Sequence, residues 1–111
     1  MNERAYRQVP EFVKQQQSQI ENLCRRYGVK QLELFGSAVT PDFDPATSDL
    51  DFLVEFDLSL NIGSWLTAYF DFKEGLEALF GRSVDLVSFN AIENPHLREQ
   101  IESQRSLLYA A

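Results

Sequence analysis

Three aspartates in this sequence are placed where their carboxylates could act together. Asp49 and Asp51 stand at the head of an apolar run, and Asp85 lies near the start of another. Side chains two positions apart on a β-strand point to the same side, with Cα atoms about 6.5 to 7 Å apart. Carboxylates held so close repel one another unless a cation lies between them. The acids are therefore either solvated residues at strand ends or ligands of a metal ion.

Magnesium is the metal whose chemistry suits such a set of acids. Mg²⁺ prefers hard oxygen ligands and commonly takes one or two carboxylates together with substrate phosphates. If the strand carrying Asp85 lies beside the strand carrying Asp49 and Asp51, the third acid completes a site for two-metal phosphoryl transfer. In that site the metals would polarise the α-phosphate, neutralise charge on the leaving pyrophosphate and lower the pKa of an attacking hydroxyl.

A Gly-Ser pair precedes the acids and suits a turn that grips phosphate. Gly36 and Ser37 follow a short apolar run, and eleven residues separate Ser37 from Asp49. Glycine lets the backbone come close to a ligand. The N–H and hydroxyl of a serine at a strand-to-helix turn can donate to phosphate oxygens. A Gly-Ser pair alone usually marks only a turn, but its order before Asp-x-Asp predicts nucleotide binding by Gly36 and Ser37.

The elements that must position these residues follow from the spacing of apolar residues. Alternation predicts three strands, over residues 29–35, 49–56 and 83–89. In the second strand the side chains of Leu50, Phe52, Val54 and Phe56 share one face, and Asp49 and Asp51 lie on the other. The acids would therefore project from the face of the sheet opposite to this apolar face.

Helical spacing predicts the remaining elements, over residues 11–27, 64–80 and 96–109, the last opened by Asn94 and Pro95. The apolar face of the second helix is expected to comprise Trp65, Leu66, Tyr69, Phe72, Leu76 and Leu79 or Phe80. In the last helix, Leu97, Ile101 and Leu108 share one side. The order α-β-β-α-β-α predicts a two-layer α+β fold, a mixed β-sheet with helices packed on it.

Composition narrows the class of partner. The 111 residues suffice for a single domain over residues 1–111, to which an oligomer could add stability. The net charge of −7 leaves no basic footprint for direct nucleic-acid binding. Mg²⁺ could still mediate nucleotide binding, and a basic protein would be attracted. With one cysteine, Cys24, no apolar signal core and no bilayer-length apolar stretch, we expect a soluble cytoplasmic protein without membrane contact.

The segments LFGS, SDLDFLVEF and VDLV together resemble the minimal nucleotidyltransferase domains of the DNA polymerase beta-like superfamily. The resemblance covers roughly residues 20 to 109, and the ending LREQIESQRSLLYAA looks like the closing helix of the small stand-alone members. It implies the nucleotidyltransferase fold and Mg²⁺-dependent transfer of a nucleoside monophosphate. Asp49, Asp51 and Asp85 would be the catalytic and metal-binding acids. Stand-alone members are typically antitoxins paired with a HEPN-domain ribonuclease toxin, and some transfer AMP from ATP to a toxin tyrosine.

One departure from the family pattern keeps alternatives open. Many relatives follow Gly-Ser with Ala-Arg-Gly, whereas this loop is about one residue longer and carries Thr40 and Pro41 where Arg and Gly are expected. The leading interpretation is an enzyme that uses ATP and Mg²⁺ to modify a hydroxyl, expected to be that of a tyrosine, of a HEPN-type toxin. The second is a protein of the same fold that neutralises its partner by contact alone. The third is an unrelated small α+β domain.

Overall fold

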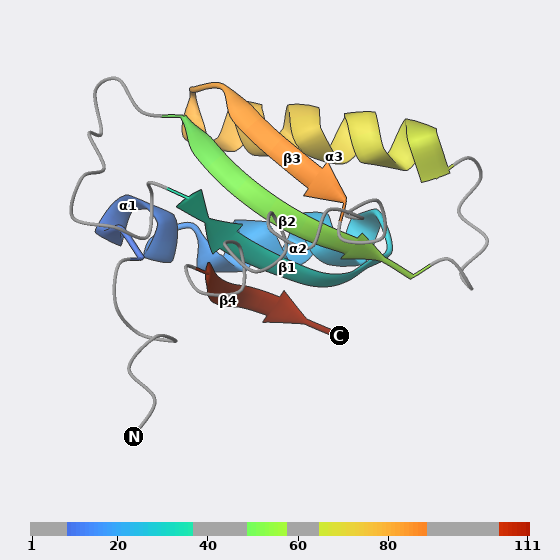
Figure 1. Ribbon diagram of the computed structural model, residues 1–111, viewed down its shortest axis with the longest axis horizontal. Helices are drawn as coiled ribbons and strands as arrows, with labels where there is room; N and C mark the ends of the chain where they lie inside the picture. Colours follow the sequence, from blue (N-terminus) through green and yellow to red (C-terminus); the bar gives the residue numbers. More distant parts are fainter. Residues whose placement is uncertain (1–8, 37–48, 58–64, 89–104) are drawn as a thin grey trace.

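The computed structural model describes residues 9–36, 49–57, 65–88 and 105–111. Its elements follow in chain order along the ribbon of Figure 1. They are α1 (Glu11–Lys14), α2 (Gln17–Arg26), β1 (Val29–Phe35), β2 (Leu50–Phe56), α3 (Trp65–Phe80), β3 (Val84–Ser88) and β4 (Arg105–Ala110). In the part of the chain thus described, no helix is both long and apolar enough to cross a membrane.

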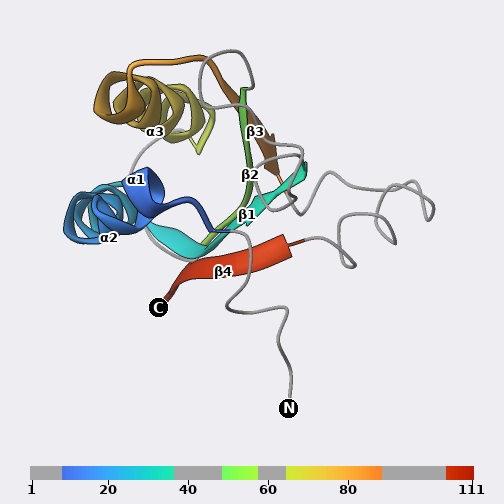
Figure 2. The ribbon, with the colours of Figure 1, turned by 90° about the vertical axis from the view of Figure 1, so that its left-hand side faces the viewer.

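The four described strands form one mixed sheet in the order β3-β2-β1-β4. β1 pairs antiparallel with β2 and with β4, whereas β2 and β3 run parallel. The α3 helix supplies the crossover between the parallel strands, as such a connection requires. Figure 2 shows all three helices on one side of the sheet. The predicted two-layer α+β architecture with a mixed sheet is therefore confirmed.

The core lies between this sheet and the helices, and the alternation in β2 explains how it is filled. The four apolar residues of one face, Leu50, Phe52, Val54 and Phe56, are all buried in the core. The ring of Phe72 in α3 contacts two other rings edge-on and so joins the helices to the sheet. The distance between ring centroids is 6.2 Å to Phe56 of β2 and 6.3 Å to Tyr27, which follows α2. The opposite face of β2 is left to carry the acids.

The first predicted helix is divided in two. The backbone N–H of Gln16 donates to the carbonyl of Val13 at 3.0 Å, a tight turn that separates α1 from α2. Ile20 and Cys24 of α2 nevertheless join Val13 of α1 in the same core, so both helices pack on the sheet. Burial raises the pKa of the Cys24 thiol to about 12, which fits a packed side chain and not a nucleophile.

The predicted closing helix is wrong over its last residues. Arg105–Ala110 form strand β4, which pairs with β1, while residues 96–104 lie outside the described residues. Ser106 and Leu108 are buried and Leu107 is 54% exposed, so burial follows the period of a strand. Leu108 fits both a helical stripe and this alternation. The open edge of β1 decided between them, since its backbone groups need partners.

In α3 the bounds are close to the prediction, and the predicted apolar face is confirmed from Tyr69 onward but not at Leu66. Leu66 was expected in the core and is 51% exposed, whereas Ala68 is buried. Phe72 and Leu76 are buried as predicted and form, with Ala68, a stripe of residues four positions apart that lies in the core. Ala68 was absent from the predicted face, because a small side chain contributes little to the hydrophobicity of the sequence.

Candidate active site

The parallel pairing of β2 with β3 brings two of the predicted acids together. Asp51 and Asp85 are direct partners in the register of the two strands. Neighbouring strands lie about 4.8 Å apart, and side chains at paired positions point to the same face. Asp49 immediately precedes β2, two positions from Asp51. The expectation that the strand of Asp85 lies beside the strand of the Asp-x-Asp pair is therefore confirmed.

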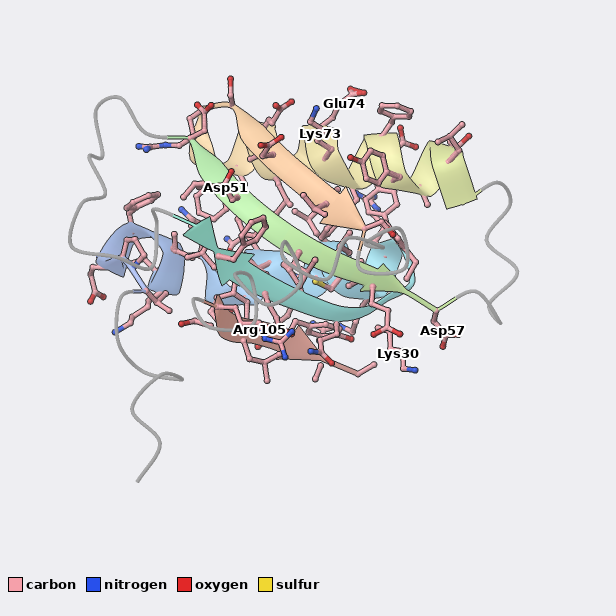
Figure 3. All side chains as sticks on the ribbon, viewed as in Figure 1. Lys30, Asp51, Asp57, Lys73, Glu74 and Arg105 are labelled. Carbon is pink, nitrogen blue, oxygen red and sulfur yellow. The ribbon has the colours of Figure 1, made fainter. Side chains whose placement is uncertain are left out.

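The three acids differ in their surroundings. Asp49 and Asp85 are exposed, whereas Asp51 is partly buried near the start of β2, where Figure 3 shows it close to the end of β1. Burial, the negative charge of Asp85 and that of Asp49, in decreasing order of effect, together raise the pKa of the Asp51 carboxyl to about 6. A cation bound between these carboxylates would relieve that repulsion.

The antiparallel pairing of β1 with β2 places Gly36 at the same end of the sheet as Asp51. Phe35, the last residue of β1, is the register partner of Asp51. Gly36 follows with a φ of 73°, a left-handed conformation that L-residues seldom adopt. The structure thus brings Gly36 and the acids together, while Ser37, the other predicted phosphate ligand, lies outside the described residues.

The three aspartates are suitable ligands for a hard divalent cation, although they do not surround a single point. Among the described residues, no three side chains from His, Cys, Asp and Glu converge on a common point. What the sheet provides is alignment: Asp51 and Asp85 share a face and a register position, and Asp49 adjoins them. Carboxylate oxygens are the ligands that Mg²⁺ accepts, with water and phosphate oxygens completing its shell. The chemistry of the acids therefore fits Mg²⁺.

The same face of the sheet carries a polar cluster that the sequence did not predict. Glu33 of β1 is 4% exposed, and its Oε2 accepts from Nε of Arg105 at 3.0 Å. Gln31 also donates to the Glu33 carboxylate. Arg105 is labelled in Figure 3, on β4 beside β1. The sequence did not predict this pair, because Arg105 was expected in a helix. The one feature that pointed to a buried ion pair was Glu33, which stands between Leu32 and Leu34 in the predicted strand.

Asp51 should make the stability of the metal-free protein depend on pH. Because its pKa is raised, the folded state holds this proton more tightly than the unfolded chain, so Asp51 costs stability above about pH 6. That cost fades as the pH falls toward 4. Asp51→Asn should therefore stabilise the protein at pH 8 by about 1–2 kcal/mol, after allowance for screening by water, and hardly at all at pH 4.

Thermal unfolding in EDTA at pH 4, 6 and 8 measures this difference. The exposed Asp71 of α3 supplies a matched control, since Asp71→Asn makes the same change of charge away from the acids. A gain in stability for Asp51→Asn that does not vary with pH would contradict a destabilising charge on partly buried Asp51 beside the other acids. A large loss of stability at pH 8 would contradict it as well.

A mixed sheet backed by helices on one face, with aligned aspartates on the other, is typical of domains that transfer phosphoryl or nucleotidyl groups. The model of the nucleotidyltransferase domain family matches residues 17–108. The chain belongs to the nucleotidyltransferase domain family and is an enzyme of that class.

Two archaeal relatives are similar over most of their length. A Methanocaldococcus jannaschii protein with the provisional name protein adenylyltransferase MJ1379 is 38% identical over 77 residues, which cover 69% of this chain and 74% of the relative. The protein adenylyltransferase MntA of Thermococcus cleftensis is 36% identical over 74 residues, covering 67% and 70%.

Solved structures agree with the fold. One provisionally described as a minimal nucleotidyltransferase has a TM-score of 0.68 and 34% identity, covering 86% of this chain and 91% of the other. A complex of a tri-AMPylated Shewanella oneidensis HEPN toxin with its MNT antitoxin contains a chain with a TM-score of 0.60 and 22% identity, covering 88% and 72%. At that identity the second likeness shows the fold alone.

Proposed function

We propose that this protein transfers AMP from ATP to a hydroxyl, that of a tyrosine, on a HEPN-type toxin and thereby acts as its antitoxin. The observation that carries the proposal is the register of Asp51 with Asp85 on two parallel strands. Membership of the nucleotidyltransferase family supports the transfer. The names of the relatives support a protein acceptor, and the AMPylated toxin bound to a protein of this fold supports the partner.

Asp49, Asp51 and Asp85 would hold Mg²⁺, and Gly36 and Ser37 would lie against the phosphates. The bound ion would supply positive charge that neutralises the triphosphate and the leaving pyrophosphate. Asp85 is exposed on β3, at the edge of the described sheet, so a side chain of a partner protein can reach it. Its carboxylate can accept the proton of an acceptor hydroxyl. The hydroxyl oxygen then bonds to the α-phosphorus as the bond to pyrophosphate breaks.

The charge of the chain favours a protein acceptor over a nucleic acid. A net charge of −7 repels a polyphosphate backbone but attracts a protein with a basic surface. A single nucleotide differs from a nucleic acid because a few Mg²⁺ ions can neutralise it. We place the reaction in the cytoplasm, where ATP and Mg²⁺ are available, and assign it to residues 1–111 acting as one domain.

Intact-mass spectrometry of the partner tests the proposal. Incubated with the protein, ATP and Mg²⁺, a cognate HEPN-type toxin should gain the mass of one or more AMP units, and peptide mapping should locate them on tyrosine. The gain should vanish with EDTA or with an ATP analogue that cannot be cleaved at the α-phosphate. A toxin that stays unmodified and active would refute both the transfer and the antitoxin role.

A second function, neutralisation by contact alone, is favoured by one observation in the sequence. Thr40 and Pro41 replace the Arg-Gly that many relatives carry after Gly-Ser, which removes a cationic side chain from the expected nucleotide site. Both residues lie outside the described residues. The same experiment separates the two functions, because contact alone would inhibit the toxin without changing its mass.

A further inference from the structure

Gly36 and Asp51 meet where β1 ends beside the start of β2. Asp51 is the register partner of Phe35, and Gly36 comes next along the chain. A Cβ atom placed on Gly36 would overlap Oδ2 of Asp51 and would lie 3.1 Å from its Cγ and 3.3 Å from its Cβ. The Asp51 carboxylate thus occupies the space that any side chain at position 36 would need.

Two independent features therefore require glycine at position 36. The first is conformational, since its φ of 73° is strained for an L-residue. The second is steric, since the neighbour that would have to move is the carboxylate of a predicted metal ligand. Gly81 shares only the first feature: its φ is 63°, and a Cβ there would meet nothing within 4 Å. Gly81→Ala is therefore a matched control for the conformational cost of Gly36→Ala.

We propose that Gly36 is a positioning residue that fixes the place of the Asp51 carboxylate on the acid face of the sheet. The inference rests on the proposed function, which assigns Asp51 to bind Mg²⁺. It differs from the phosphate-gripping role predicted for Gly36. In that role the missing side chain makes room for a ligand, whereas here it makes room for Asp51. An alanine at position 36 would displace the carboxylate from this place.

The steric part can be tested by thermal unfolding in EDTA. Gly81→Ala should lower Tm by about 5 °C, the cost of the left-handed conformation alone. Gly36→Ala should lower it by at least twice as much. In an Asp51→Asn background, which keeps the shape of the side chain, the loss should persist. In an Asp51→Ala background, which removes Oδ2 and Cγ, it should fall close to that of Gly81→Ala, because only the contact with Cβ at 3.3 Å remains.

Binding of Mn²⁺ alone, measured by calorimetry, tests the consequence for the metal. Gly36→Ala should weaken Mn²⁺ binding roughly 10- to 100-fold, the range seen when a group that orients a ligand is lost. Gly81→Ala should leave it unchanged. Weakened binding of an ATP analogue with unchanged Mn²⁺ binding would assign Gly36 to the phosphates and overturn the proposal.

The unfolding series decides the proposal even if the proposed function fails. A wild-type protein that binds neither Mn²⁺ nor nucleotide would refute the function, while the dependence of the Gly36→Ala loss on the Asp51 side chain would still establish the contact. Equal losses for Gly36→Ala and Gly81→Ala in every background would overturn the positioning role. If Gly36→Ala does not fold alone, a folded Gly36→Ala/Asp51→Ala variant supports the proposal, and an unfolded one contradicts it.

Discussion

Replacing Asp49 and Asp51 together with asparagine should abolish transfer of AMP to the partner toxin. We expect the rate to fall at least about 1,000-fold, equivalent to about 4 kcal/mol of transition-state stabilisation. Asparagine keeps the size and hydrogen-bonding reach of aspartate but removes both negative charges next to Asp85. The remaining carboxylate would be too weak a ligand to hold Mg²⁺ against water.

The fold should survive this change, which makes the result interpretable. Asp49 is exposed, and the charge of Asp51 is opposed by its burial and by its two acidic neighbours, so the variant should be at least as stable as the wild type above pH 6. Binding of the toxin should also persist, because these two acids are assigned to the metal and not to the contact with the partner.

Intact-mass spectrometry and a toxin activity assay should be performed on the same samples. Loss of the mass gain, with the complex retained, would support the enzyme. Inhibition of an unmodified toxin to the same extent by wild type and double variant would instead establish the contact-only antitoxin. Asp71→Asn with Glu74→Gln, two exposed acids of α3, is a control for the change in net charge.

Phe72→Ala should have the largest effect on stability. Phe72 is fully buried and its ring contacts Tyr27 at the end of α2 and Phe56 at the end of β2, so it connects both helix and sheet layers. Removing a buried phenylalanine ring leaves a cavity and typically costs about 3–5 kcal/mol. For a domain of this size that cost should lower Tm by more than about 12 °C.

Phe70 provides the matched control for this change. It has the same side chain in the same helix, two residues away, but is 52% exposed and lies edge-on to Tyr69 with centroids 5.2 Å apart. Phe70→Ala should cost less than about 1 kcal/mol. Similar losses in the two variants, measured by chemical denaturation, would show that Phe72 does not anchor the core as described.

The sequence alone determined the strands that position Gly36 and the acids. Val29–Phe35 forms a strand as predicted, and β2 begins one residue later than predicted. These strands were predictable because an alternating sequence has only one way to bury its apolar face. The same alternation placed Asp51 on the face opposite to Phe52. Local chemistry thus determined both the existence of these strands and the direction of their acids.

Only the tertiary structure decided which elements are neighbours. The pairing of Asp51 with Asp85 depends on β3 lying parallel to β2, which the sequence allowed without requiring. Arg105–Ala110 became a strand because β1 offered an unpaired edge, and an apolar segment with two competing periods adopts the state that satisfies more backbone groups. The fit of the Asp51 carboxylate against Gly36 likewise depends on the β1–β2 register, since only the pairing of distant segments determines which side chain fills the space beside a glycine.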